Sequence, residues 1–280
     1  MILILAMMLS CGRRTPYRTV DIVFTSHHDA GSGVYGMDLS TGNIHALYIG
    51  PKNVIPMSVS LNTFHTMVLF ISNQDIYYNI YLLNLPSGNL DRLTPDNTNY
   101  GVPVFCFNKK IVYVTYPSTD LPQIYQMNID GTSAGIMISE QDGATDPACS
   151  GNKVAYISDP LGSAGLKIYD IATGVSITTG VWHISSKPAF SPDGARIVYS
   201  QLNSDGYQSL YILDLSTMSS STLLSQNYDA YEPSWGINNK IAFTTTKDGT
   251  STSDIYQINS DGTGLKKLIQ YGDEDGNPSW

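Results

Sequence analysis

A chain of 280 residues is long enough for one large all-β domain or two ordinary domains, and a hydrophobic content of 42% allows a sizeable core. Glycine (24), proline (14) and tyrosine (19) are abundant, and no long segment repeats apolar residues at helical spacing, so the composition favours an all-β fold. The net charge of −9 argues against nucleic acid as a partner, because nucleic-acid binding needs a basic face.

The first ten residues are typical of an export signal. Residues 2–9 form an unbroken apolar run, which is too short to span a bilayer but suits the core of a signal peptide. The run is followed by Ser10 and Cys11, and this ending resembles the lipobox of bacterial lipoproteins, in which the cysteine is lipidated. We therefore expect a signal peptide at residues 1–10, a lipid anchor on Cys11, a linker at 11–19, and a location in the periplasm or at the outer membrane. No lysine or arginine precedes the run, and a short buried strand is the alternative.

A unit of about 44 residues recurs along the rest of the chain. Each unit opens at a proline, and these prolines are 47, 44, 41, 45 and 45 residues apart: Pro56, Pro103, Pro147, Pro188, Pro233 and Pro278. After the proline come two short runs of aliphatic and aromatic residues, a turn, and a last short strand. The clearest copy is residues 187–217, in which Ser191-Pro192-Asp193-Gly194 predicts a tight reversal between the first two strands.

Four strands in about 44 residues is the size of one blade of a β-propeller. The unit at residues 20–43 lacks a proline-led first strand, whereas residues 276–280 supply a first strand and nothing more. The two fragments complete each other. The sequence therefore predicts an all-β, six-bladed propeller over residues 20–280, with four-stranded blades and the C-terminal strand completing the first blade. The recurrent tyrosines, such as Tyr81 and Tyr256, are expected to fill the space between blades.

The pattern of the clearest copy resembles the WD-like repeat of TolB-type β-propellers. The residues that carry the resemblance are Pro188, Phe190, Ser191-Pro192-Asp193-Gly194, Ile197, Tyr199, Tyr211 and Asp214. The resemblance extends, less completely, over nearly all of the chain after residue 18. It implies a propeller that binds other proteins. We expect a monomer that acts as a non-enzymatic binding platform for a protein or peptide of the bacterial cell envelope. The α/β domain and the hydrolase domain that accompany propellers of this type elsewhere are not expected, because the repeats begin by residue 20.

Binding is expected on the loops that join the last strand of one blade to the first strand of the next, because these loops surround one mouth of the central channel. Tyrosine and tryptophan on such loops are typical interface anchors. The candidate binding residues are Tyr100, Asp146, Trp182, His183, Tyr228, Tyr231, Glu232 and Asp273. Trp182 and Tyr231 stand shortly before a proline and are expected to lie near the channel.

Two alternatives use the same mouth. One is a propeller enzyme acting on a polysaccharide or a lactone, with Ca²⁺ bound by the carboxylates of the loops; His183 is the only histidine of these loops that could take part. The other is a carbohydrate-binding module, which the aromatic residues would suit. No catalytic residue is assigned, and no cofactor is expected apart from Ca²⁺ in the enzyme alternative.

Three further motifs indicate loops. The run 131–135 matches the nucleophile elbow G-x-S-x-G around Ser133, but it lies in a predicted hairpin with no helix after it. The run 31–36 matches G-x-G-x-x-G and leads into a strand where a dinucleotide site requires a helix. His27, His28 and Asp29 are adjacent ligand types, and adjacent residues rarely converge on one metal ion, so a solvated loop is preferred.

Two cysteines remain if Cys11 is lipidated. Cys106 lies three residues after Pro103 and Cys149 lies two residues after Pro147, so their side chains are expected to point to opposite strand faces. On this ground we expect two free, buried thiols.

Overall fold

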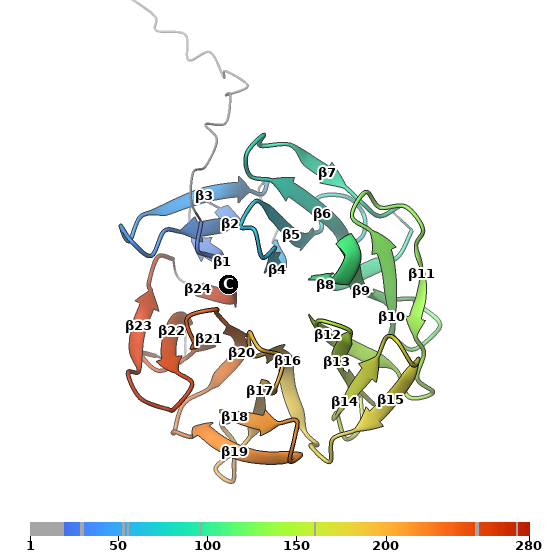
Figure 1. Ribbon diagram of the computed structural model, residues 1–280. Helices are drawn as coiled ribbons and strands as arrows, with labels where there is room; N and C mark the ends of the chain where they lie inside the picture. The colour runs from blue at the N-terminus through green and yellow to red at the C-terminus, as the bar shows by residue number, and fades with distance from the viewer. Residues whose placement is uncertain are drawn as a thin grey trace, which may run out of the picture.

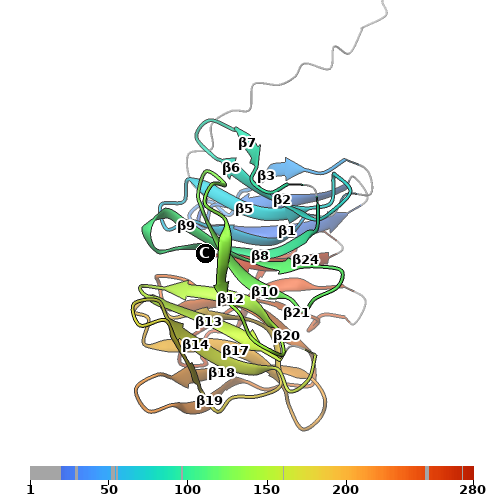
Figure 2. The same ribbon diagram turned by 90° about the vertical axis from the view of Figure 1, so that its right-hand side faces the viewer.

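The computed structural model describes residues 20–28, 31–51, 54, 56–95, 97–159, 161–249, 252–272 and 274–280. Within these residues the strands form six four-stranded antiparallel sheets, which are arranged as blades around a central channel (Figure 1). Figure 2 shows the same ring turned by 90°. No helix in the described ranges is long and apolar enough to cross a bilayer.

Each blade runs from the channel outwards in chain order, except the first. Blade 1 contains β24 (Glu274–Ser279), β1 (Ile22–His28), β2 (Gly31–Met37) and β3 (Ile44–Ile49); blade 2 contains β4 (Met57–Leu61), β5 (Met67–Ser72), β6 (Asn79–Asn84) and β7 (Leu90–Arg92). Blade 3 contains β8 (Asn99–Cys106), β9 (Lys110–Tyr116), β10 (Gln123–Asn128) and β11 (Gly135–Ile138), with the one-turn helix η1 (Phe107–Lys109) after β8. Blade 4 contains β12 (Ala144–Ser150), β13 (Lys153–Ser158), β14 (Gly165–Asp170) and β15 (Val175–Thr178). Blade 5 contains β16 (Ile184–Phe190), β17 (Arg196–Leu202), β18 (Gln208–Asp214) and β19 (Ser219–Leu224); blade 6 contains β20 (Ala230–Trp235), β21 (Lys240–Thr245), β22 (Asp254–Asn259) and β23 (Lys266–Ile269).

The predicted closure of the ring is confirmed. The C-terminal strand β24 pairs antiparallel with β1, with Thr25 opposite Gly276 and Val23 opposite Ser279. Blade 1 is therefore built from both ends of the described chain, and β24 covers the edge of β1 that would otherwise be unpaired.

The predicted turn in blade 5 is also present. The amide of Gly194 donates to the carbonyl of Ser191 at 2.8 Å, and Gly194 adopts a left-handed backbone with φ 68°. The carboxylate of Asp193 accepts from the hydroxyl of Ser191 at 2.5 Å and from the amide of Ala195 at 3.0 Å. These hydrogen bonds lower the pKa of Asp193.

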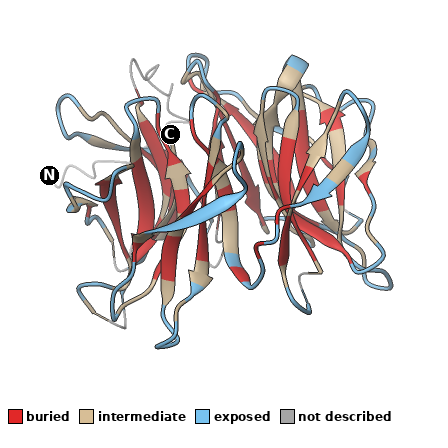
Figure 3. Cartoon of the chain, turned by 60° about the horizontal axis from the view of Figure 1, so that its bottom comes forward, coloured by how far each residue is buried: buried red, intermediate tan, exposed pale blue. Residues whose placement is uncertain are grey.

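The hydrophobic core lies between the blades, where the sheets face each other. Each of six clusters of buried side chains draws on two neighbouring blades, and Figure 3 shows the buried residues along the strands and exposed residues mainly in the turns. In the first cluster Phe70 of blade 2 packs between Tyr48 of blade 1 and its own neighbour Tyr81, with ring centroids 4.9 and 5.7 Å apart. Burying a ring of this size stabilises the fold by about 1.5–3 kcal/mol. The recurrent tyrosines Tyr81 and Tyr256 are core residues, as predicted.

Five of the six innermost strands begin earlier than the sequence indicates, and only β4 follows its proline directly. We expected each to open at its proline, but Pro147 lies in the middle of β12 and Pro188 near the end of β16. A bulge in each strand explains the difference, because the proline occupies a place at which the ladder needs no amide donor.

The prediction of free thiols is wrong, because Cys106 and Cys149 form a disulfide with a Cα–Cα distance of 5.3 Å. Their side chains do leave opposite faces of equivalent strands, as expected. Neighbouring blades of a propeller stack face to face, however. One face of blade 3 therefore packs against the opposite face of blade 4. Both cysteines consequently lie in the cluster between these two blades.

Candidate functional site in the central channel

Each innermost strand carries a β-bulge at the same level of the channel. In blade 4, Thr145 pairs with Ile157 and Ala148 with Ala155, so Asp146 and Pro147 share the place of one residue. The other five blades shift register at the equivalent place. The bulged residues form a ring, which we call the channel ring: Ser58, Val102, Asp146, Lys187, Glu232 and Asn277. All six line one cavity of about 310 Å³.

The local sequence favours these bulges. A proline follows the channel-ring residue in every blade except blade 2, and proline has no amide proton that the bulge would leave unpaired. The backbone is left-handed at five of the six positions, with φ between 45° and 52°; Lys187 is the exception. A bulge re-aims a side chain out of the alternation of the strand, and here it directs one residue of each blade to the cavity.

Charge is confined to one half of the channel ring. Asp146, Lys187 and Glu232 belong to the consecutive blades 4, 5 and 6, whereas Ser58, Val102 and Asn277 of the other half are uncharged. Burial raises the pKa of Asp146, and Lys187 opposes this shift. Burial likewise lowers the pKa of Lys187 against the attraction of Glu232 and Asp146. In the described part of the chain no salt bridge joins Lys187 to either carboxylate.

Glu232 differs from the other two charged residues because it is fixed by hydrogen bonds. Its carboxylate accepts from the hydroxyl of Thr244 at 2.8 Å and from the backbone amide of Asn277 at 2.9 Å. The second bond ties blade 6 to the strand that closes blade 1. Glu232 is therefore a structural residue as well as a lining residue, and its removal would leave the amide of Asn277 without an acceptor.

The donor set of this cavity does not fit Ca²⁺. Calcium is held by six to eight oxygen ligands, and the positive charge of Lys187 lies in the same cavity as the two carboxylates. Among the residues that the structure describes, no group of three or more His, Cys, Asp or Glu side chains could hold a metal ion. The cavity presents an ammonium, a carboxylate and hydroxyl groups, which suit hydrogen bonds with a polar ligand of mixed charge.

Sequence comparison adds to this geometry. The family model described as the TolB beta propeller domain matches residues 106–280, which is more than half of the chain. The chain belongs to the TolB β-propeller family. Blades 4 to 6, the three outer strands of blade 3 and the closing strand β24 lie within the matched range, and so do four residues of the channel ring.

Individual relatives agree with the family. The chain is similar to the Tol-Pal system protein TolB of Francisella tularensis, with 26% identity over 231 residues that cover 78% of this chain and 52% of the relative. It thus spans about half the length of the curated relatives it matches. Among solved structures, TolB from Acinetobacter baumannii is similar with a TM-score of 0.78, 19% identity, and coverage of 92% of this chain and 66% of that chain. Oligogalacturonate lyase from Vibrio parahaemolyticus shares the fold with a TM-score of 0.58, 16% identity, and coverage of 80% and 71%.

The predicted binding residues of the TolB propeller do not form one site. Asp146 and Glu232 line the channel. Tyr231 precedes Glu232 in β20 and is partly buried, and burial followed by the charge of Glu232 raises its pKa to about 12. Tyr228 is also partly buried, and burial followed by the charge of Asp248 raises its pKa. Asp273 lies outside the described residues.

Three of the predicted residues lie away from the channel. Trp182 and His183 line a separate cavity of about 400 Å³ together with Tyr199 and Ser220, and Ser220 belongs to the outermost strand of blade 5. Trp182 is 42% exposed, and Gly165 leaves room for its ring. Tyr100 is buried and its hydroxyl donates to Asn97 at 2.8 Å. His183 therefore does not share a cavity with Asp146 and Glu232, as the enzyme alternative would require.

Lys187 is the functional candidate that the sequence interpretation missed. It stands directly before Pro188, as Asp146 and Glu232 stand before their prolines. The same positional signal identifies all three residues, as well as Val102 and Asn277.

Proposed function

We propose that this chain is a non-enzymatic, protein-binding platform of the bacterial cell envelope, and that its partner binds at the channel ring. The observation that carries the proposal is the channel cavity itself. Six bulges direct one side chain from each blade to a single polar cavity, and none of its three charged groups forms a salt bridge among the described residues. The curated relatives are named as proteins of the Tol-Pal system, which supports an envelope partner.

The face of the propeller that the partner contacts follows from the topology. Strands within each blade are antiparallel, so the linkers between blades lie on one face, and the turns between third and fourth strands lie on the other. The channel-ring residues stand within the innermost strands, and Ser185 and Ser186, on the linker side of Lys187, line the same cavity, so we place the partner on the linker face. Tyr231 of β20 adds an aromatic group beside the ring, of the kind that concentrates binding energy.

We expect Asp146→Asn, Lys187→Met and Tyr231→Ala each to weaken binding of the envelope partner by about 1–3 kcal/mol. Glu232 is left unchanged, because its carboxylate holds the amide of Asn277. The partner is first captured by cross-linking to the chain in an envelope extract. It is then purified and titrated by calorimetry against each variant.

The matched controls are Asp130→Asn and Asp261→Asn on the opposite face. Both residues are exposed and each accepts from the threonine two positions later, an interaction that asparagine retains. If affinity falls for these two variants and not for the channel-ring variants, the partner binds the opposite face and the proposal is wrong.

A lipid anchor on Cys11 is part of the same proposal, although residues 1–19 lie outside the described residues. The apolar run before Cys11 supports it. We expect Cys11→Ala to remove incorporation of labelled palmitate and to leave the signal peptide uncleaved, whereas Cys106→Ala should leave the label unchanged. Equal labelling of the Cys11→Ala variant and the unaltered chain would show that Cys11 is not the lipid site.

A further inference from the structure

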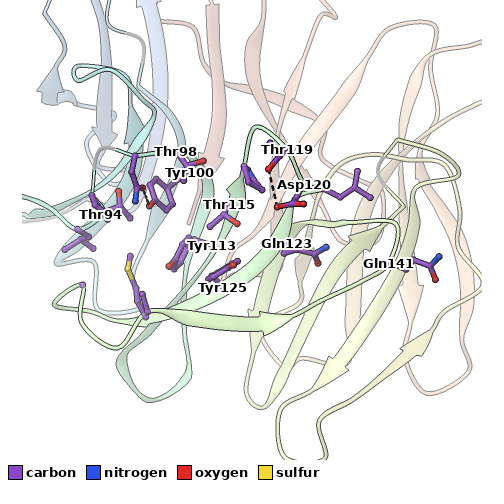
Figure 4. A pocket seen from close by; sticks show the side chains of 18 residues that line it. Thr94, Thr98, Tyr100, Tyr113, Thr115, Thr119, Asp120, Gln123, Tyr125 and Gln141 are labelled. Atoms are coloured by element: carbon purple, nitrogen blue, oxygen red, sulfur yellow. Dashed lines mark hydrogen bonds between the residues drawn. The ribbon is translucent and has the colours of Figure 1, made fainter.

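A large cleft lies on the outer side of the propeller between blades 2 and 3. Its volume is about 870 Å³, within the range of ligand sites, and it shares no lining residue with the channel cavity. Tyr100, Tyr113 and Tyr125 line it from three successive strands of blade 3, and Asp120 of the β9–β10 loop lies nearby with its hydrogen bond from Thr119 (Figure 4).

In two other blades the equivalent position is filled by a cation from the chain itself. In blade 2 the hydroxyl of Tyr81 donates to Asp75 at 2.5 Å, and Arg92 binds the same carboxylate oxygen at 3.0 Å. In blade 6 Tyr256 donates to Asp248 at 2.8 Å, and Lys267 forms a salt bridge with Asp248. Arg92 and Lys267 each stand directly across from the tyrosine on the outermost strand.

Blade 3 lacks this cation. The residue across from Tyr125 is Ile136, whose side chain is 52% exposed. The corresponding loop of blade 3 also contains an acidic residue, Asp120, but in the described ranges its side chain forms no salt bridge and accepts only one hydrogen bond, from the hydroxyl of Thr119 at 3.4 Å. The cleft therefore presents a carboxylate and a tyrosine without the positive charge that accompanies them in blades 2 and 6.

A second polar group in the cleft also lacks a partner. Tyr113 lines the cleft, and within the described part of the chain no residue forms a hydrogen bond with its hydroxyl, which is not fully enclosed. Its counterpart in blade 4, Tyr156, donates to Glu140, and that carboxylate is in turn bound by Lys167 at 3.0 Å. Tyr113 thus offers a donor at the floor of the cleft to an oxygen that the protein does not provide.

We propose that this cleft binds an extended peptide segment through a lysine or arginine side chain, with the cationic group against Asp120 and the tyrosines and a peptide carbonyl accepting from the hydroxyl of Tyr113. The cation takes the place that Arg92 and Lys267 hold in blades 2 and 6. Tyrosine faces attract such groups, and a charged hydrogen bond to a carboxylate is among the stronger polar contacts. The site is separate from the channel ring, so this inference does not depend on the function proposed above.

The test uses the full chain and the peptide acetyl-Ala-Ala-Lys-Ala-Ala-amide. Binding is followed by the NMR chemical shifts of backbone amides around Asp120. We expect Asp120→Asn to weaken binding about tenfold, because a hydrogen bond between charged groups is lost. Tyr113→Phe should weaken it by a smaller factor. Asp205→Asn, in the corresponding loop of blade 5, is the matched control and should have no effect.

Ile136→Arg gives a sharper result, because it supplies the missing cation from within the chain. This variant should no longer bind the peptide and should melt at a higher temperature than the unaltered chain. A peptide with norleucine in place of lysine should not bind. The inference is overturned if the norleucine peptide binds equally well, if Asp120→Asn or Ile136→Arg leaves binding unchanged, or if spermidine binds as tightly as the peptide, since a free amine would then suffice.

Discussion

Removal of residues 276–280 is expected to abolish the native monomer. These residues form most of β24, which pairs with β1 and closes the ring. They also bond outside blade 1: the amide of Asn277 donates to Glu232, the amide of Trp280 donates to Ser234, and the hydroxyl of Ser279 accepts from the amide of Leu61. Together these contacts join blades 6, 1 and 2, and their loss should cost about 5 kcal/mol or more, a large part of the stability of a typical domain.

The measurement is thermal unfolding by circular dichroism together with the molar mass in solution. The truncated chain should be unfolded at room temperature, or should dimerise through the exposed edge of β1. A synthetic peptide covering residues 274–280, added in excess, should restore a cooperative transition, whereas a peptide of the same composition in scrambled order should not. A truncated monomer that melts at the same temperature as the intact chain would show that the ring does not need its closing strand.

The number of blades and the closure were predictable because both depend on local features that recur. A proline, an aliphatic-aromatic pair and a turn return every 44 residues or so, and only a ring accommodates a first strand at one end and three strands at the other. The turn at Ser191-Pro192-Asp193-Gly194 is fixed by residues adjacent in sequence. Such features do not require knowledge of which side chains meet across blades.

The channel ring was only partly predictable, because a bulge changes the face on which a residue lies. By simple alternation Tyr231 and Glu232 point to opposite faces of β20, and the sequence does not indicate which of them reaches the channel. The bulge directs Glu232 to the cavity and not its neighbour. The positions of the linker side chains depend on the path of longer connections, which the local sequence does not determine. Trp182 stands five residues before Lys187, and in the folded chain it reaches the outer cavity.

The cleft between blades 2 and 3 could not be predicted from the sequence, because recognising it depends on which residues pair across the strands. The chain between blades 2 and 3 contains nothing unusual, and Ile136 is an ordinary strand residue. Its significance comes from comparison with Arg92 and Lys267, and the three are recognised as equivalent only when each is paired with its tyrosine. The fold is therefore encoded in what the repeats share, whereas both candidate sites depend on how single positions differ between repeats.

The disulfide illustrates the same point and carries the second large effect. Cys106 and Cys149 are 43 residues apart, and closing a loop of that length restricts the unfolded chain enough to stabilise the fold by about 4 kcal/mol. The bond joins blades 3 and 4, so it also fixes one interface of the ring. A disulfide of this kind persists in an oxidising compartment, in agreement with the export that we propose.

We expect the Cys106→Ala/Cys149→Ala variant to unfold at a markedly lower denaturant concentration than the oxidised chain. The free energy of unfolding should fall by about 4 kcal/mol, the contribution of loop closure. Both proteins should carry Cys11→Ala, so that no third thiol interferes. The reduced chain should unfold like the double variant, because both lack the cross-link, while reducing agent should not alter the variant itself. Intact mass spectrometry supplies the direct observation: the unreduced chain should be lighter than the reduced chain by two hydrogen atoms. Equal masses before and after reduction, or equal stability of the oxidised chain and the double variant, would show that the two blades are not cross-linked in solution.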